Sequence, residues 1–451
     1  MRSVKLIKQT RLSVLFLLSL FIIYFSLSTA VQAIDIKRSV LPNGLTVLHV
    51  ERHNLPIVMV TLLVKAGPPD ETPARAGLAN LTADLLNEGT KKRKAVDISE
   101  DIDFIGASLG ASADSDYTTV SLSVLKKDVE KGFEIFSDII LNPLFPDEEI
   151  KRVKELVKGS LRQSEEEPSF LATRAFKKAV YGDLPYGRLV SGSIETIDAL
   201  KREDIAGFHT AYYKPNNSFL SVVGDLTEDE LRSLLRKYLE GWKQAEIPKR
   251  QPLQEPRKKR ENIQIDRDLT QANILIGHAG ISRVNPDYYA VSVMNYVLGG
   301  GGFSSRLMQM VREERGLAYD IHSHFAPFKE GGLFEVGVQT KNQSANTVIG
   351  LVNEQIGRIR KERVSDQELE DAKAYLTGSF PRRLDTNRKI ADFLVVAEFY
   401  GLGVDYVDKY PGYVNSVTAD DVSRVAGKYL DPAGLVTVVV GRQSEISLKN
   451  E

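Results

Sequence analysis

The sequence contains no cysteine and no excess of charge of either sign. Its 451 residues include 59 Lys and Arg against 60 Asp and Glu. Without cysteine the chain can form no disulfide, thiol nucleophile, thiolate metal site or lipid-modified cysteine. The balanced charge provides no field that would recruit nucleic acid. These absences exclude thiol enzymes and nucleic-acid-binding proteins.

Long apolar runs are also missing, except near the N-terminus. Four basic residues precede the apolar stretch 12–27, and small residues ending in Ala33 follow it. This order is typical of a secretory signal peptide over residues 1–33. An uncleaved anchor is the alternative, but the 16 apolar residues are fewer than the roughly 20 of a spanning helix. We expect an exported, periplasmic protein with no stable membrane span after cleavage.

The chain contains an internal repeat. The segments 196–226 and 413–443 align at a single offset of 217 residues. Each copy predicts a short helix, a Tyr-x-x-Pro turn and a β-branched strand that ends in Gly. The matched pairs are Asp204 with Asp421, Tyr212 with Tyr429, Pro215 with Pro432, and Gly224 with Gly441. The chain therefore consists of two homologous halves.

Each half is expected to be strand-rich, then helical, then strand-rich again. In the first half, 45–53 and 57–66 alternate like paired strands, and 118–125 is another strand. Helices are predicted over 77–88, 147–165 and 167–181. The pattern predicts an α+β fold in which each half has a mixed, largely antiparallel sheet with helices on one face.

The two halves are separated by a basic, proline-rich segment. We place the N-terminal domain at 34–247, the linker at 248–262 and the C-terminal domain at 263–451. The linker has three prolines and many Lys and Arg but no apolar period. A charged binding patch is possible in principle, but this composition favours a solvated linker.

The histidines do not predict a metal site by themselves. His49 and His53 would share a metal on a helix, but they fall in a strand, where four residues span about 13 Å. His322 and His324 lie about 7 Å apart on one face of a strand and lack a visible third ligand. Both pairs are interpreted as ordinary surface or pocket residues.

Other catalytic motifs are equally absent. The sequence has no Gly-x-Ser-x-Gly elbow. The glycines 299–302, Gly299, Gly300, Gly301 and Gly302, lack the Gly-Lys-Ser/Thr ending of a phosphate loop. They predict a close backbone approach or a hinge, and both interpretations favour a site over a core.

The segment GLANLTADLLNEGT, residues 77–90, resembles the zinc helix of the pitrilysin/insulinase family, which includes mitochondrial processing peptidase. The family pattern there is GLAHFLEHMLFKGT. Asn80 stands in place of the first His, Ala83 in place of the general base Glu, and Asp84 in place of the second His. The resemblance places the third ligand, a Glu, at Ser160, supported by the matching segment 165–192 just downstream. It thus implies a degenerate zinc site that binds no metal.

The second half follows the family pattern much more closely. The segment 300–325 matches the stretch in which an Arg and a Tyr contact substrate and the developing charge of the scissile carbonyl. These residues are Arg312 and Tyr319, whose guanidinium and phenol can donate hydrogen bonds to peptide oxygens. The alternative is that Arg312 pairs with a neighbouring Glu, such as Glu313 or Glu314, and that Tyr319 fills the core.

One more departure affects the first half. The family has an Asn-Ala pair on the edge strand that pairs with substrate, whereas this chain has Gly110-Ala111. Some family members divide the work between a zinc-bearing subunit and a homologue without zinc. The resemblance therefore implies a clam-shell of two halves that acts as the zinc-free subunit of a heterodimer, with zinc in the partner and an unstructured peptide as substrate. The alternatives are a stand-alone peptide-binding or assembly protein and an autonomous zinc peptidase with unorthodox ligands.

Overall fold

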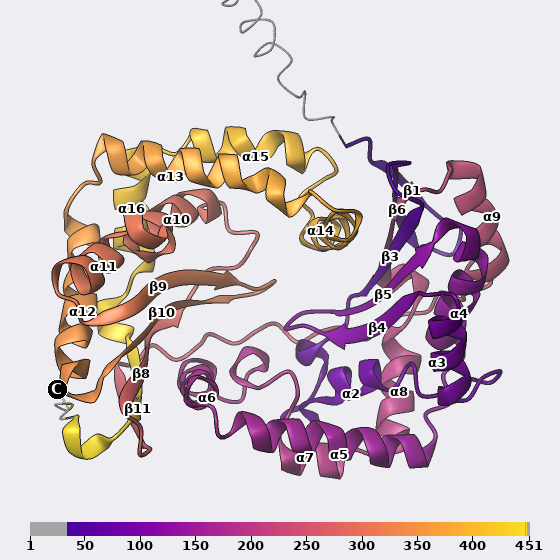
Figure 1. Cartoon of the computed structure of the whole chain (residues 1–451), viewed down its shortest axis with the longest axis horizontal. Coiled ribbons are helices and arrows are strands. Elements are labelled where there is room, and N and C mark those ends of the chain that lie inside the picture. The colour runs from indigo at the N-terminus through magenta and orange to yellow at the C-terminus, as the bar shows by residue number, and fades with distance from the viewer. Residues whose placement is uncertain (1–33, 447, 449–451) are drawn as a thin grey trace, which may run out of the picture. The chain divides into compact units, whose positions relative to one another are not determined.

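The computed structural model describes residues 34–446 and residue 448. The predicted signal peptide, residues 1–33, lies outside the described residues. Residues Lys37–Glu451 form one compact unit that contains two β-sheets (Figure 1). Within the described part of the chain, no helix has the length and apolar character needed to cross a bilayer.

The N-terminal half forms a six-stranded sheet in the order β1-β2-β6-β3-β5-β4. Neighbouring strands are antiparallel except for β2 and β6, which are parallel. The segments predicted as paired strands are β2 and β3, but β6 lies between them, so the predicted pairing is wrong. Local alternation cannot indicate a strand that enters from far along the chain. The strands are β1 (Lys37–Val40), β2 (Thr46–Glu51), β3 (Ile57–Val64), β4 (Ser108–Ala113), β5 (Thr118–Leu125) and β6 (Ser218–Gly224).

The C-terminal half forms a five-stranded sheet in the order β7-β11-β8-β10-β9. The pair β7 and β11 is parallel and the other neighbours are antiparallel. Because β7 begins at Glu261, the last two residues of the predicted linker belong to this sheet. The strands are β7 (Glu261–Asp266), β8 (Gln271–Ala279), β9 (Ala318–Pro327), β10 (Gly332–Lys341) and β11 (Val436–Gly441).

The internal repeat corresponds to the same supersecondary unit in both halves. Helix α8 (Arg202–Tyr212), a 3₁₀ turn and β6 form the first copy, and α16 (Ala419–Tyr429), a 3₁₀ turn and β11 form the second. In each copy the final strand runs parallel to an early strand of its own half. The prediction of two homologous halves in an α+β clam-shell is confirmed.

Helices of each half cover one face of its own sheet, as predicted, and their apolar side chains form two large cores. The helices on the first sheet, besides α8, are α2 (Leu78–Asp84), α3 (Ala95–Phe104), α4 (Val129–Leu141), α5 (Asp147–Ser164), α7 (Ile194–Ala199) and α9 (Glu228–Tyr238). Those on the second sheet, besides α16, are α10 (Tyr288–Asn295), α11 (Arg306–Met308), α12 (Ala345–Lys361), α13 (Asp366–Ser379) and α15 (Tyr406–Asn415).

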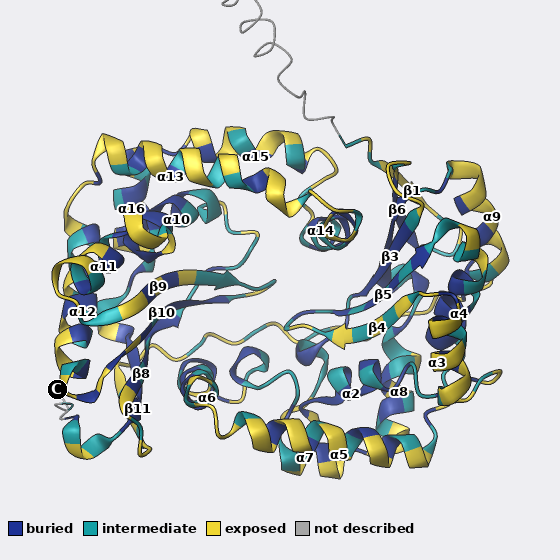
Figure 2. Ribbon diagram, in the orientation of Figure 1, coloured by how far each residue is buried: buried dark blue, intermediate teal, exposed yellow. Residues whose placement is uncertain are grey.

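The opposite face of each sheet is covered by a helix from the other half. Helix α6 (Pro168–Tyr181) packs on β8 and β11, and α14 (Asn387–Tyr400) packs on β3 and β6. The hydroxyl of Ser221 on β6 donates to the carbonyl oxygen of Ala391 at 2.7 Å, which joins sheet and helix. This exchange explains why β3 and β6 are buried along nearly their whole length (Figure 2).

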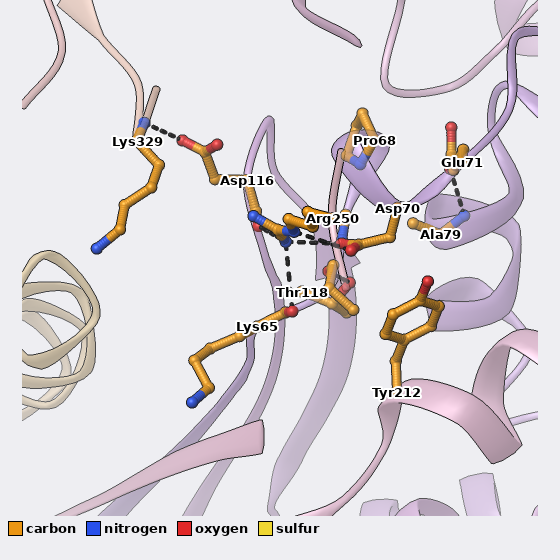
Figure 3. A network of polar contacts seen from close by, with 12 residues as sticks. Lys65, Pro68, Asp70, Glu71, Ala79, Asp116, Thr118, Tyr212, Arg250 and Lys329 are labelled. Atoms are coloured by element: carbon orange, nitrogen blue, oxygen red, sulfur yellow. Dashed lines mark hydrogen bonds and ion pairs between the residues drawn. The ribbon is translucent and has the colours of Figure 1, made fainter. Parts of the chain in front are cut away.

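A buried polar network also joins the halves and the linker (Figure 3). Arg250, in the segment predicted as solvated, donates to both carboxylate oxygens of Asp70 at 2.6 and 2.8 Å. The same guanidinium donates to the carbonyl oxygens of Lys65 and Asp116. The Asp116 carboxylate accepts from the backbone N–H of Lys329, in the C-terminal half, at 2.8 Å. The linker is therefore anchored by the half-buried Arg250, which pairs with the buried carboxylate of Asp70.

Candidate functional site

The helix at the position of the family's zinc motif is held by several contacts at its N-terminus. The predicted helix 77–88 is α2, which is shorter and ends at Asp84. Gly77 precedes it with φ +94°, a left-handed conformation that suits glycine, and a Cβ there would lie 2.8 Å from the carbonyl oxygen of Ser191. The carboxylate of Glu71 accepts from the N–H group of Gly77 at 3.2 Å. It also accepts from the N–H group of Ala79 at 2.6 Å (Figure 3). Burial raises the pKa of Glu71 to about 7.

The four degenerate zinc positions line a single cavity of about 510 Å³. Asn80, Ala83 and Asp84 come from α2, and Ser160 comes from α5. Spacing along α2 brings the first three together, because residues three and four apart share a helix face. The structure thus brings together the positions that the resemblance assigned, including Ser160 from a distant helix.

The groups in this cavity do not fit zinc. Zinc requires three or four His, Cys, Asp or Glu ligands, whereas these positions provide an amide, a methyl group, a carboxyl and a hydroxyl. Across residues 34–446, no group of three or more His, Cys, Asp or Glu is arranged to hold a metal ion. We therefore assign no metal chemistry to this cavity.

The environment of the Asp84 carboxyl disfavours its charged form. The amide nitrogen of Asn80 donates to Asp84 Oδ2 at 2.9 Å. Burial, and secondarily the charge of Glu88, raise the pKa of Asp84 to about 6. Without a positive group beside it, the charged form of Asp84 is thus less stable in this cavity than in water.

Strand β4 borders the same cavity and forms the edge of the N-terminal sheet. Gly110 and Ala111, the pair that replaces the family's Asn-Ala, both line the cavity. β4 is the last strand of its sheet and alternates between exposed and half-buried residues. An edge strand of this kind can accept an extended peptide as an additional strand.

In the second half, Arg312 and Tyr319 lie side by side. The Arg312 guanidinium carbon is 4.6 Å from the ring centroid of Tyr319 and 4.6 Å from that of Phe303. Tyr319 is 83% exposed, so it does not fill the core as the alternative predicted. Arg312 does contact Glu313, at 3.5 Å, as the same alternative expected. The pair is therefore a stacked, accessible group of donors.

Phe303 was missed at the sequence level. It follows the four glycines and is 63% exposed. The signal available in the sequence was its position, directly after a glycine tract that had already been assigned to a site. Its ring stacks on the guanidinium that the sequence did identify.

A Cβ would lie closer than 3.0 Å to a neighbouring atom at Gly299, Gly300 and Gly301, and the backbone of Gly302 is left-handed. A Cβ at Gly299 would lie 2.5 Å from Ser323 Oγ and 2.6 Å from Ser323 N, on β9. Gly302 has φ +56° and open space around it. The predicted close approach thus occurs at Gly299, and the hinge stays a prediction.

A second cavity, of about 670 Å³, lies beside Tyr319. His322 and His324 on β9 line it, together with Glu335 on β10. The two histidines lie on one face of β9, as predicted. His322 Nδ1 is 2.8 Å from Asp320 Oδ2, and His324 Nε2 is 3.4 Å from Glu335 Oε2. Burial raises the pKa of Glu335. The histidines are therefore pocket residues with carboxylate partners.

The other histidine pair is divided between two environments. His49 is buried on β2, its Nε2 lies 2.9 Å from the carbonyl oxygen of Leu226, and burial lowers its pKa. His53 is exposed and contacts Asp225 at 2.6 Å and Glu51 at 2.8 Å. Neither arrangement resembles a shared metal site.

Comparison with known proteins matches both halves to one peptidase family. The model for insulinase, peptidase family M16, matches residues 46–193, and the model for the peptidase M16 inactive domain matches 199–376. An uncharacterized zinc protease of Streptomyces coelicolor is 28% identical over 411 residues, which cover 90% of this chain and 89% of the relative. An uncharacterized zinc protease of Bacillus subtilis is 25% identical and covers 79% of this chain and 86% of its own length.

Two solved structures also superimpose on this chain over most of its length. The peptidase M16 inactive domain from Pseudomonas fluorescens superimposes with a TM-score of 0.85 at 28% identity, covering 92% of this chain and 99% of that one. A protease from Helicobacter pylori superimposes with a TM-score of 0.83, covering 90% of this chain and 99% of that one. At 20% identity the second match shows the fold alone.

Proposed function

The chain belongs to the M16 peptidase family and lacks its zinc motif, and we propose that it is the zinc-free subunit of a periplasmic peptidase. It would pair with a zinc-bearing homologue and bind unstructured peptides. The observation that carries this proposal is the difference between the halves. The N-terminal site has none of the family's zinc ligands or its base, whereas Arg312 and Tyr319 are present and accessible.

In this proposal the two donors act on a peptide held at the partner's site. The Arg312 guanidinium and the Tyr319 hydroxyl would donate hydrogen bonds to the scissile carbonyl oxygen as negative charge develops there. The rings of Phe303 and Tyr319 each contact the Arg312 guanidinium and restrict its orientation, which lowers the entropy lost when it binds. The peptide itself would add as a strand to an edge such as β4.

A second candidate is a peptide-binding or assembly protein without any hydrolytic role. The cavity between α2 and α5 favours this candidate. It lies beside the edge strand β4, where a peptide could bind, although its residues do not fit zinc. An autonomous zinc peptidase has little support, because the groups at Asn80, Ala83, Asp84 and Ser160 are unsuited to the metal.

The test is a paired assay. The mature chain is purified alone and together with its zinc-motif homologue, and bound zinc and cleavage of an unstructured fluorogenic peptide are measured. We expect the chain alone to be free of zinc and inert, and the pair to cleave. Arg312→Ala and Tyr319→Phe should each lower kcat/KM of the pair by roughly 100-fold, the scale of one lost oxyanion donor.

The matched control is Arg315→Ala, which removes an exposed arginine three residues from Arg312. It should leave cleavage by the pair unchanged. Zinc and cleavage in the chain alone would contradict the proposal. Inactivity of the pair, with peptide binding retained, would favour the second candidate.

A further inference from the structure

We propose that the cavity between α2, α5 and β4 binds the side chain of a lysine or arginine in an extended peptide. This inference rests on the proposed function, since it names the class of peptide that the chain selects. It assigns a role to Asn80 and Asp84, which the degenerate zinc motif leaves without one. Three independent features of the cavity support it.

The first feature is the sign of the charge. Among the described residues that line the cavity, the charged ones are Asp84 and Glu88, and none is Lys, Arg or His. Glu88 has a counterion outside the cavity, since its carboxylate lies 2.5 Å from Arg152 Nη2. Asp84 accepts a hydrogen bond from the neutral amide of Asn80. A positive group is therefore the complementary ligand.

The second feature is a surplus of acceptors. Asn87 also lines the cavity, and its side-chain oxygen is buried without a hydrogen-bond partner among the described residues. A buried acceptor without a donor is destabilising, because the hydrogen bonds that it makes with water in the unfolded chain are not replaced. A lysine ammonium brings three N–H donors and an arginine guanidinium brings five. Such a ligand could donate directly to the Asp84 carboxylate, which accepts from Asn80 at Oδ2, whereas the buried Asn87 oxygen would have to turn toward the cavity first.

The third feature is an apolar wall contributed by α5 and by Phe170 on α6. Lys and Arg carry long aliphatic stems that favour apolar surface, while the charged end seeks polar groups. Leu156 on α5 is 60% exposed, so part of this wall is open to a ligand. The apolar lining residues are Val153, Leu156, Val157, Leu161 and Phe170.

Strand β4 provides the direction from which the side chain would enter. Gly110 borders the cavity, and no atom lies within 4 Å of the place where its Cβ would be. The backbone of a peptide can thus approach β4 closely. In a paired strand alternate side chains point to the same face, so a single residue of the peptide would enter the cavity.

The experiment measures binding to the mature chain by fluorescence anisotropy. Two labelled, unstructured peptides differ in one central residue, which is lysine in the first and ε-acetyl-lysine in the second. We expect the lysine peptide to bind roughly tenfold more tightly, the scale of one charged hydrogen bond. Asp84→Asn should reduce this preference to less than about threefold.

A second variant and a control separate the site from general charge effects. Ser160→Arg places a guanidinium on the exposed surface of α5 at the cavity, and it should also abolish the preference. Glu100→Gln removes an acidic charge from the exposed surface of α3 in the same half, and it should change nothing.

Each outcome is decisive. A preference that is lost in Asp84→Asn and Ser160→Arg but kept in Glu100→Gln supports the inference. Equal binding of the two peptides, or a preference that survives Asp84→Asn, overturns it and leaves the proposed function standing. Absence of binding to either peptide overturns the inference as well, and the cleavage assay with the partner then decides separately on the proposed function.

Discussion

Replacing Asp84 by asparagine should stabilise the protein at neutral and alkaline pH. The pKa of Asp84 is raised from 3.8 to about 6, chiefly by burial. Each unit corresponds to 1.36 kcal/mol, so a shift of about two units sets an upper limit of about 3 kcal/mol. Asparagine has nearly the same shape, and its side-chain oxygen can accept the bond from Asn80 that Asp84 Oδ2 accepts now. The substitution therefore removes the desolvated charge and keeps the contact.

The sign of the pH dependence follows from the direction of the shift. The folded state binds the proton of Asp84 more tightly than the unfolded state does, so this residue costs nothing below pH 4. The cost grows between pH 4 and pH 6 and is constant above pH 6. We expect Asp84→Asn to raise the free energy of unfolding by about 1–3 kcal/mol at pH 8, and by much less at pH 4.5.

Urea denaturation at the two pH values measures this difference. The sole tryptophan, Trp242, is buried in the N-terminal half and reports its unfolding by fluorescence. Glu100→Gln, on the exposed surface of α3, is the control and should have no effect at either pH. A gain equal at both pH values, or no gain at pH 8, would refute the reasoning.

Three further predictions concern the packing of the chain. Arg250→Ala leaves Asp70 as a buried, unpaired charge and should lower the free energy of unfolding by about 3–5 kcal/mol, measured by urea denaturation. Gly299→Ala should lower the thermal midpoint more than Gly302→Ala, because its Cβ meets Ser323 whereas Gly302 loses only a favourable backbone conformation. The N-terminal half expressed alone should aggregate, and co-expression with the C-terminal half should restore solubility, as light scattering would report.

The division into homologous halves could be predicted because its signals are local. The repeat places a helix, a Pro turn and a strand in one short segment of each half, and these are α8 with β6 and α16 with β11. Helix–strand order within such a segment depends on periodicity and turn residues, which the sequence displays directly.

The exchange of α6 and α14 could not be predicted in the same way. Each helix has clear ends: Pro168 opens α6, and Gly182 and Gly401, with φ +61° and +70°, follow the two helices. Those residues define where a helix begins and ends but not which sheet it covers. The covered sheet depends on the path of the chain between the halves. The sequence predicted β3 as a paired strand and β6 as the β-branched strand of the repeat, and neither pattern indicates which helix covers the second face of the sheet.

The cavity shows the same division between local and distant signals. Asn80, Ala83 and Asp84 share a helix face, so their proximity follows from spacing. Ser160 lies on a different helix, and an exposed serine there carries no signal of its own. Only the resemblance to a peptidase family placed it at the site. Glu88 and Asn87, which determine the polarity of the cavity, were not identified at all.

The charged carboxylate of Asp84 lowers the stability of the folded chain unless a bound ligand neutralises it. Its raised pKa means that the folded chain is less stable with a charged Asp84 than with a neutral residue of the same shape. The buried oxygen of Asn87 adds a second cost in the same cavity. Natural proteins tolerate such local costs chiefly at functional sites, where binding offsets them. A positively charged side chain that pairs with Asp84 would remove the first of these costs, which links the stability gain expected for Asp84→Asn to the loss of lysine preference expected for the same variant.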